Sequence, residues 1–174
     1  MKHDITYPSS DGKTKIHAII WEPEASPQAV LHICHGMVDY ADRSDDFAQH
    51  AADQGYYVVA NDHLGHGASV ITDDQHGYFA HPNGNECVIA DIHTLRTMTQ
   101  KKYPDLPYFF LGHSMGSFLT RQYIQMHADG LSGAIIMGTG SQPGIILHIG
   151  KLICRTIALF RGWTYRSAFV DNMA

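Results

Sequence analysis

The chain has 174 residues, which is enough for one domain with a hydrophobic core. Hydrophobic residues make up 44% of it and charged residues 17%, a balance typical of globular proteins. The sequence has no run of about 18 uncharged apolar residues that could cross a bilayer. The net charge of -5 provides no basic face for phosphate groups, which excludes nucleic acid as an expected partner.

The first residues and the cysteines indicate the cellular compartment. The opening stretch MKHDITYPSSDGK has no apolar segment of signal-peptide length, which predicts a cytoplasmic location. Cys34, Cys87 and Cys154 are widely spaced and odd in number. This pattern favours reduced thiols buried in the core over a disulfide framework.

An antiparallel hairpin is expected at the start of the chain. Residues 4–7 and Lys15–Trp21 read as short strands around the turn cluster Ser-Ser-Asp-Gly. A third strand is expected at Ala29–Cys34, followed by a helix that Ser44 can cap and Gly55 can close.

Strands and helices then alternate. Further strands are expected at 56–60, 108–111 and 134–137. The helices between them are marked by apolar residues at helical spacing, namely Val88, Ile92, Leu95 and Met98 in one, and Met115, Phe118, Leu119, Tyr123 and Met126 in the next. The order predicts an α/β fold with a mostly parallel sheet and helices on both faces.

A last amphipathic helix is expected at 145–160. Its apolar residues fall on one side, and His148, Lys151 and Arg155 fall on the other.

The stretch YFFLGHSMGSFLT contains a serine at a predicted strand-to-helix turn. A sharp turn there exposes the Ser114 hydroxyl above the sheet, and only residues without bulky side chains, such as Gly112 and Gly116, fit beside it. Helix N–H groups at this position favour developing negative charge. The pattern predicts a nucleophile elbow, and the alternative is a turn that only joins strand to helix.

A second loop supports the same site. His35-Gly36-Met37 follows a predicted parallel strand at its carboxyl end, where open α/β sheets bind ligands. Acyl transfer through Ser114 needs two backbone donors for an oxyanion, and the N–H groups of Met115 and Met37 are the candidates. Taken alone, the loop could be an ordinary connection.

These segments together resemble the α/β-hydrolase superfamily, and most closely its monoacylglycerol lipase and lysophospholipase branch (the serine aminopeptidase-like, or Hydrolase 4, group). The resemblance covers residues from about 30 to 140. One departure is Asp39-Tyr40, where the branch usually has a Glu-His pair. The matching pieces are His35-Gly36, Gly55-Tyr56, Asp62 with Gly65-His66-Gly67 and Ser69, and Gly112-His113-Ser114-Met115-Gly116.

The resemblance implies a carboxyl-ester hydrolase of lipid metabolism, acting without a cofactor on a monoacylglycerol, a lysophospholipid or a similar ester. Ser114 would form an acyl-enzyme. The resemblance further implies that residues 1–140 are the N-terminal part of the hydrolase core, that 141–174 begin a cap, and that the last strands of the sheet are missing.

The general base is not assigned. In this fold the acid and the histidine follow the serine, and the resemblance places both beyond Ala174, so the chain looks like the N-terminal part of a longer hydrolase. Asp129 and His148 satisfy the order but not the context.

Two partner surfaces are expected. The strand at 134–137 would form an unpaired apolar edge that invites self-association. The helix at 145–160 could shelter an acyl chain as a cap or contact a membrane surface, and an ordinary helix packed on the core is the third possibility.

Other classes of function compete with this interpretation. A zinc site could use His32, Cys34, His35, His63 and His66, but His32 and His35 fall on opposite strand faces and no acid sits at ligand spacing, so no metal is expected. A non-catalytic binding remnant is another alternative, and a peptidase or a haloperoxidase-like enzyme is a third.

Overall fold

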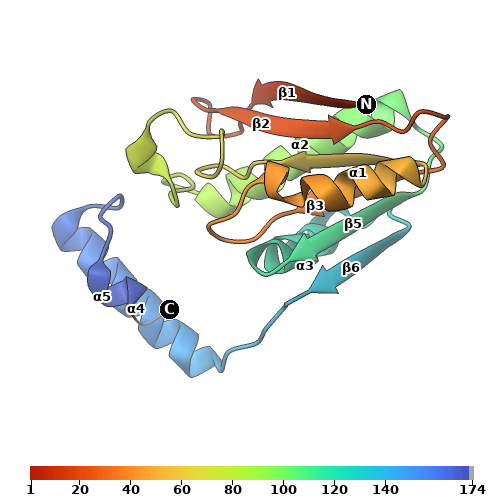
Figure 1. The fold of residues 1–174 in the computed structure, drawn as a ribbon. Coiled ribbons are helices and arrows are strands. Elements are labelled where there is room, and N and C mark those ends of the chain that lie inside the picture. Colours follow the sequence, from red (N-terminus) through yellow and green to blue (C-terminus); the bar gives the residue numbers. More distant parts are fainter. Residues whose placement is uncertain (173–174) are drawn as a thin grey trace. The chain divides into compact units, whose positions relative to one another are not determined.

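The computed structural model describes residues 1–172 (Figure 1). The chain forms two compact units, Met1–Thr139 and a second that starts at Gly140. The first unit contains a six-stranded sheet in the order β1-β2-β4-β3-β5-β6. Its strands are β1 Lys2–Pro8, β2 Lys15–Trp21, β3 Ala29–Cys34, β4 Tyr56–Asn61, β5 Tyr108–His113 and β6 Gly133–Met137.

The sheet has the predicted mixed pairing. β1 and β2 form an antiparallel hairpin, and β2 also pairs antiparallel with β4. The remaining pairs, β3 with β4, β3 with β5 and β5 with β6, are parallel. The carboxyl ends of β3, β4, β5 and β6 therefore meet at one end of the sheet, where ligands bind in open α/β folds.

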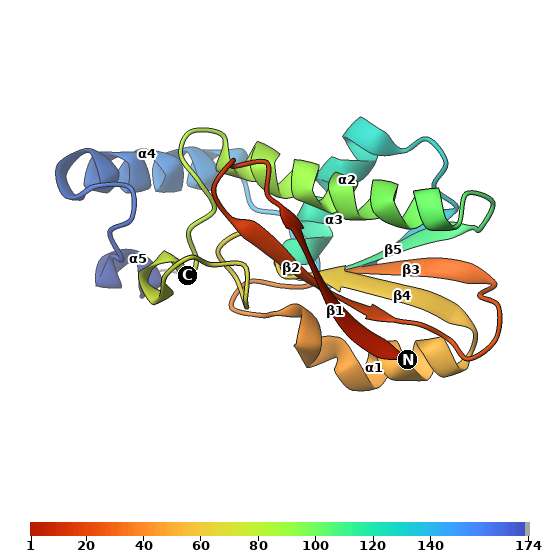
Figure 2. The ribbon, with the colours of Figure 1, turned by 90° about the horizontal axis from the view of Figure 1, so that it is seen from above.

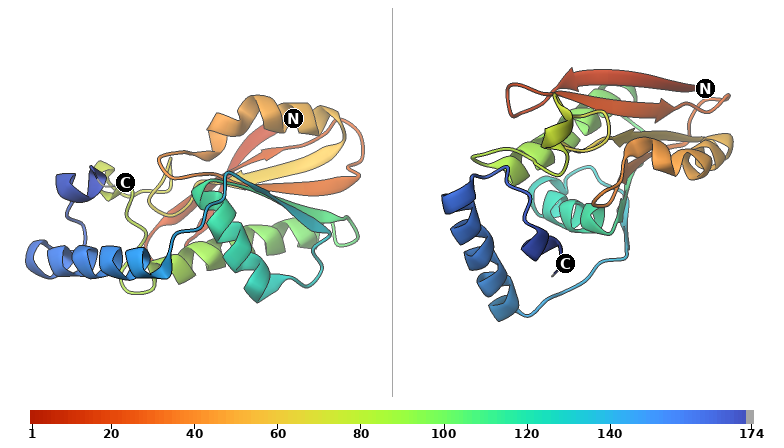
Figure 3. Two further views of the ribbon diagram at one scale, coloured as in Figure 1. Left: turned by 90° about the horizontal axis from the view of Figure 1, so that it is seen from below. Right: turned by 60° about the vertical axis from the view of Figure 1, so that its left-hand side comes forward.

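Helices cover both faces of the sheet, as predicted (Figures 2 and 3). α1 packs on one face, over a core that includes Trp21, Ile33 and Val58. α2 and α3 pack on the other, over a core that includes Val30, Phe110 and Tyr123. The helical segments of this unit are η1 Ala41–Ser44, α1 Asp45–Asp53, η2 Asp73–Gln75, α2 Gly84–Lys102 and α3 Met115–His127.

Some details of the predicted helices are wrong. Ser44 precedes α1, but its side chain makes no capping hydrogen bond. On α3, Leu119 and Tyr123 are buried as expected, whereas Phe118 is 48% exposed and Met126 is 55% exposed. The helix instead turns small residues such as Gly116 toward the sheet, because the backbone of α3 approaches the end of β3 very closely there.

A buried arginine joins α2 to α3. The Arg96 guanidinium donates to the carbonyl oxygen of His127 (2.7 Å) and to that of Asp129. Carbonyl groups at the end of a helix have no partner within the helix, so Arg96 satisfies the last turn of α3 and its exit. This contact fixes α3, the helix that follows Ser114.

The second unit contains α4 Gly144–Arg161 and α5 Ala168–Asp171. α4 matches the helix expected at 145–160, and apolar residues such as Ile145 and Leu152 are exposed on it. Cys154 is also exposed, so the expectation that all three cysteines lie in the core is wrong for this one, while Cys34 is buried. None of the helices within residues 1–172 combines the length and the apolar character that crossing a membrane requires.

Candidate active site

Ser114 lies at the turn between β5 and α3 in a strained backbone conformation. Its φ of 52° and ψ of -119° lie in a region that side-chain-bearing residues rarely adopt, at a cost of about 1–3 kcal/mol. Two contacts hold it there. The Ser114 N–H donates to the carbonyl oxygen of Met137 on β6 (3.0 Å), and the Ser117 hydroxyl donates to the carbonyl oxygen of Ser114 (2.6 Å).

The flanking glycines are required by close backbone contacts. A Cβ atom on Gly116 would lie 2.0 Å from the carbonyl oxygen of Cys34, at the end of β3. A Cβ atom on Gly112 would lie 2.5 Å from the carbonyl oxygen of Gly116. Both distances are far below any permitted contact, so the predicted need for small residues beside Ser114 is confirmed.

The loop after β3 lies beside Ser114. A Cβ atom on Gly36 would be 3.2 Å from the Cβ atom of Ser114, which places the backbone of His35-Gly36-Met37 next to the serine. Within residues 1–172, the N–H groups of Met37 and Met115 have no acceptor. Two backbone donors close to a nucleophile are the arrangement that stabilises an oxyanion.

Hydrogen bonds of His35 and His63 brace this loop, a role that the sequence did not indicate. The His35 ring accepts the N–H of His63 at Nε2 (3.0 Å) and donates from Nδ1 to the carbonyl oxygen of Gly36 (2.8 Å). The His63 ring donates to the carbonyl oxygen of His35 (3.2 Å). Burial lowers the pKa of His35, His63 and His66, so these rings are neutral.

The histidine cluster does not fit a metal ion. Both ring nitrogens of His35 are engaged, and its ring centroid lies 4.1 Å from that of His63. His32 is held separately by the Tyr108 hydroxyl (2.8 Å), and burial lowers its pKa to about 3. In the described part of the chain, no three His, Cys, Asp or Glu side chains are arranged to hold a metal.

The Asp62 motif has a structural role. The Asp62 carboxylate is buried and accepts the N–H groups of Ala41 (2.7 Å) and Ala68 (2.8 Å), and the His17 ring lies at 2.8 Å. A Cβ atom on Gly67 would lie 2.3 Å from this carboxylate. The motif therefore ties the loop after β4 to the start of η1, so that both loops at this end of the sheet are fixed.

Asp39, where the sequence departs from the resembled branch, also supports its own loop. Its side chain is only 15% exposed, and its carboxylate accepts the N–H of Tyr40 (2.9 Å) and lies 3.7 Å from Nε of Arg43. The Asp39 carboxylate therefore forms its contacts within the loop that follows Met37.

No general base is in contact with Ser114 in the described residues. The Ser114 hydroxyl has no hydrogen-bond partner there, and the His113 ring lies between Gly36 and Gly138. Asp129 lies beyond the far end of α3, about 20 Å along the helix from Ser114. His148, in the second unit, has its ring beside the carbonyl oxygen of Gly144.

A strained serine between a parallel strand and a helix, with a backbone loop at its side, defines the α/β-hydrolase fold. The family described as serine aminopeptidase, S33 (Hydrolase_4), matches residues 25–170. The chain therefore belongs to this family.

The similar proteins include esterases and lipases. The chain is 30% identical to a monoacylglycerol lipase of Mycolicibacterium smegmatis over 139 residues, which are 80% of this chain and 46% of that one. It is 30% identical to a monoglyceride lipase of Rattus norvegicus over 67% of this chain and 37% of that one. A thermostable carboxyl esterase from Bacillus coagulans, solved in complex with glycerol, superposes with a TM-score of 0.82 at 30% identity, covering 91% of this chain and 50% of that one. The chain thus spans half or less of the length of these relatives.

Proposed function

We propose that the chain provides the nucleophile and the oxyanion donors of a carboxyl-ester hydrolase that acts on a monoacylglycerol, a lysophospholipid or a similar lipid ester. The observation that carries the proposal is the strained elbow at Ser114, because its backbone conformation costs free energy and has no use in a turn that only joins strand to helix. The names of the similar proteins, which are monoacylglycerol lipases and an esterase, support this substrate class.

The reaction would proceed through an acyl-enzyme. The Ser114 oxygen attacks the ester carbonyl carbon, and the N–H groups of Met37 and Met115 donate to the oxygen that becomes negatively charged. The intermediate collapses, and the alcohol leaves with the proton that the serine lost. Water then attacks the acyl-serine and releases the acid, which restores the Ser114 hydroxyl.

A general base must accept the serine proton, and none contacts Ser114 within residues 1–172. We therefore expect negligible turnover of a short-chain p-nitrophenyl ester by the 174-residue chain alone, measured against Ser114→Ala as the blank. Turnover that Ser114→Ala abolishes would show that a base in this chain reaches the serine.

The lack of a base in contact with Ser114 within residues 1–172 also favours a second candidate, a non-catalytic binding protein with the hydrolase fold. This candidate predicts that Ser114 is unreactive even toward phosphonylating reagents, whereas the hydrolase proposal predicts a site-selective adduct.

A peptidase is a further candidate because the family is described as serine aminopeptidase. Cleavage of an amino-acid naphthylamide in preference to an ester of the same acyl group would favour it.

The second unit would serve as the start of a cap, as the resemblance implies. On α4, exposed apolar residues such as Ile145, Leu152 and Phe160 lie on the same helix as Lys151 and Arg155, a combination that suits a lipid surface. Sedimentation with anionic phospholipid vesicles should retain the chain, and Leu152→Glu should weaken retention. Equal retention of the variant would contradict membrane contact through α4.

The remaining parts of the proposal concern location and assembly. A cytoplasmic location agrees with the absence of a membrane-crossing helix in the described residues and with cysteines that form no disulfide there. Self-association through β6 is proposed because this strand lies at the edge of the sheet with apolar side chains exposed.

A further inference from the structure

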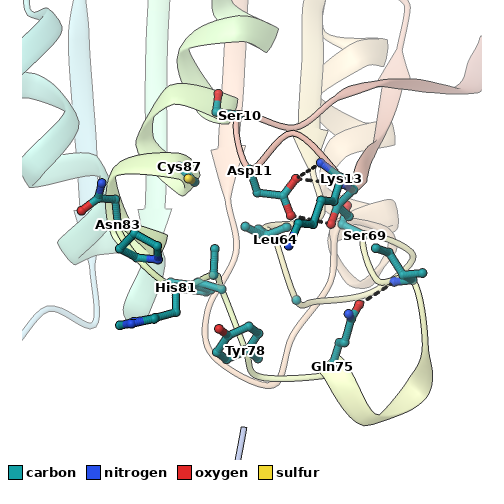
Figure 4. A pocket seen from close by; sticks show the side chains of 16 residues that line it. Ser10, Asp11, Lys13, Leu64, Ser69, Gln75, Tyr78, His81, Asn83 and Cys87 are labelled. Carbon is teal, nitrogen blue, oxygen red and sulfur yellow. Dashed lines mark hydrogen bonds between the residues drawn. The ribbon is translucent and has the colours of Figure 1, made fainter. Parts of the chain in front are cut away.

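A pocket of about 320 Å³ lies between the turn of the β1–β2 hairpin and the long loop that joins β4 to α2 (Figure 4). The hairpin turn contributes Ser10, Asp11, Lys13 and Thr14, and the other walls come from residues between Leu64 and Cys87. This volume is at the lower end of the range for small-molecule sites, about 300–1,000 Å³. None of the lining residues belongs to the site around Ser114.

The pocket has hydrogen-bond donors without partners. Within residues 1–172, no carboxylate lies within ion-pair distance of the Lys13 ammonium, which carries three donors and no acceptor. The Tyr78 hydroxyl and the Asn83 amide also line the pocket, and Asn83 does not use its side chain to cap α2. Figure 4 shows these side chains around the same pocket.

Asp11, the acidic residue of the lining, already has hydrogen-bond partners within its own turn. The Asp11 carboxylate accepts the N–H groups of Lys13 (2.8 Å) and Thr14 (2.8 Å) and the Thr14 hydroxyl (2.7 Å). Burial acts to raise the pKa of Asp11, but these hydrogen bonds outweigh burial and lower it, so the carboxylate stays ionised within the turn. The Lys13 ammonium is the group of this turn that only donates, and a ligand group that only accepts hydrogen bonds therefore fits it best.

The rest of the lining is apolar. Leu64, which is 2% exposed, Ile71, Phe79 and Cys87 form walls that suit a short hydrocarbon chain. An amphiphile with an anionic head needs a hydrogen-bond donor for the head and apolar walls for the chain. The lining of this pocket supplies both.

We propose that this pocket binds a small carboxylate that carries a short apolar chain, with Lys13 pairing the carboxylate and Leu64 and Phe79 contacting the chain. The acid released by the hydrolysis proposed above belongs to this chemical class. Only that link rests on the proposed function, because binding in the pocket does not depend on the reactivity of Ser114.

The test is a titration of the intact 174-residue chain with sodium octanoate, followed by amide chemical shifts in NMR. The largest shifts are expected at Lys13, Leu64 and Phe79. Lys13→Gln should weaken binding at least about tenfold, the loss expected for one charge-assisted hydrogen bond, and Lys13→Arg should largely retain it. Lys15→Gln is the matched control, because Lys15 is exposed, has the same charge and does not line the pocket.

Three results would each overturn the proposal. Shifts confined to Gly36, Met37 and Ser114 would place the octanoate in the candidate active site instead. Equal affinity for 1-octanol would show that the carboxylate is not recognised. Equal binding by Lys13→Gln and Lys15→Gln would exclude Lys13 as its partner.

Discussion

The two edges of the sheet are built in opposite ways. β1 carries exposed polar residues such as Lys2, Asp4 and Thr6, and the Lys2 ammonium pairs with Asp45 (2.7 Å). β6 has the apolar sequence GAIIM, with Ile135 50% exposed and Met137 47% exposed (Figure 1). Proteins protect true sheet edges with charged residues, whereas apolar strands belong inside a sheet. The composition of β6 is therefore that of a strand with neighbours on both sides.

Hydrogen bonds to Asp91 of α2 also anchor the β1 edge. The Tyr7 hydroxyl donates to the carbonyl oxygen of Asp91 (2.9 Å), and the Asp91 carboxylate accepts from the Ser9 hydroxyl (2.7 Å) and the Ser10 N–H (2.6 Å). Nothing similar binds the outer side of β6 within residues 1–172. One edge is thus fixed by buried polar contacts, and the other has no comparable contacts on its outer side within residues 1–172.

Breaking the anchor of the β1 edge should have the largest effect. Asp91→Ala leaves the Ser9 hydroxyl and the Ser10 N–H without an acceptor, and we expect the free energy of unfolding to fall by about 3 kcal/mol. Urea denaturation measures the loss. Asp91→Asn is the control, because its amide oxygen can still accept one of the two bonds and it should lose less. Equal stability of Asp91→Ala and the unmodified chain would show that the hairpin is held by apolar packing alone.

Adding a charge to β6 should make this edge as unfavourable for strand pairing as the charged β1 edge. We expect the chain to self-associate and Ile135→Lys to weaken the association at least about tenfold, since a lysine at an edge disfavours strand pairing. Light scattering over a concentration series measures this. Thr6→Lys adds the same charge to the exposed face of β1 and should change nothing. A monodisperse monomer of the unmodified chain would contradict the comparison.

The stability of the β1–β2 hairpin should depend on pH through His17 on β2, whose ring contacts Asp4 on β1. Burial acts to lower the pKa of His17, but hydrogen bonds from its ring to Asp4 and Asp62 outweigh burial and raise it. A raised pKa means that the stabilisation is fully present below the ordinary histidine value, about 6.5, and is lost as the pH rises through the folded value. The stability difference between the unmodified chain and His17→Gln should therefore shrink from pH 6 to pH 8. A difference that grows with pH would contradict the assigned contacts.

The smallest effect is expected for the ion pairs of Lys2 on the β1 edge. These pairs are partly exposed, so Lys2→Ala should cost only about 0–1 kcal/mol, and less at high salt. A comparison of thermal unfolding at low and high salt measures this. A loss that is large and independent of salt would mean that Lys2 acts through packing on Trp21, whose ring lies 5.7 Å from the ammonium.

The sequence predicted the elements well because strand and helix periodicities are local. The expected strands Lys15–Trp21 and Ala29–Cys34 have the same bounds in the structure. The exposure of Phe118 and Met126 was not predicted, because periodicity places residues on one helix face but does not say how far the sheet extends beneath that face.

The candidate site was predictable only in part. Gly112-His113-Ser114-Met115-Gly116 indicated the elbow, since a serine between glycines after a strand has few other uses. The support of the Gly36 loop by His35 and His63 was missed, because it depends on hydrogen bonds between residues 28 positions apart. The motifs His-Gly and Gly-His-Gly near strand ends were the available signal, but they were considered only as parts of the resemblance and as metal ligands, which were not expected.

The most direct test of the account is the reaction of the chain with a fluorophosphonate, followed by intact mass and peptide mapping. The strained turn at Ser114 is formed, and the N–H groups of Met37 and Met115 beside it have no acceptor within residues 1–172, so we expect one adduct on Ser114 and none in Ser114→Ala. The reaction should be slow, because no base contacts the hydroxyl within residues 1–172, and yet selective over the other serines. An unmodified chain, or equal labelling of Ser114→Ala, would contradict the assignment of Ser114 as the nucleophile.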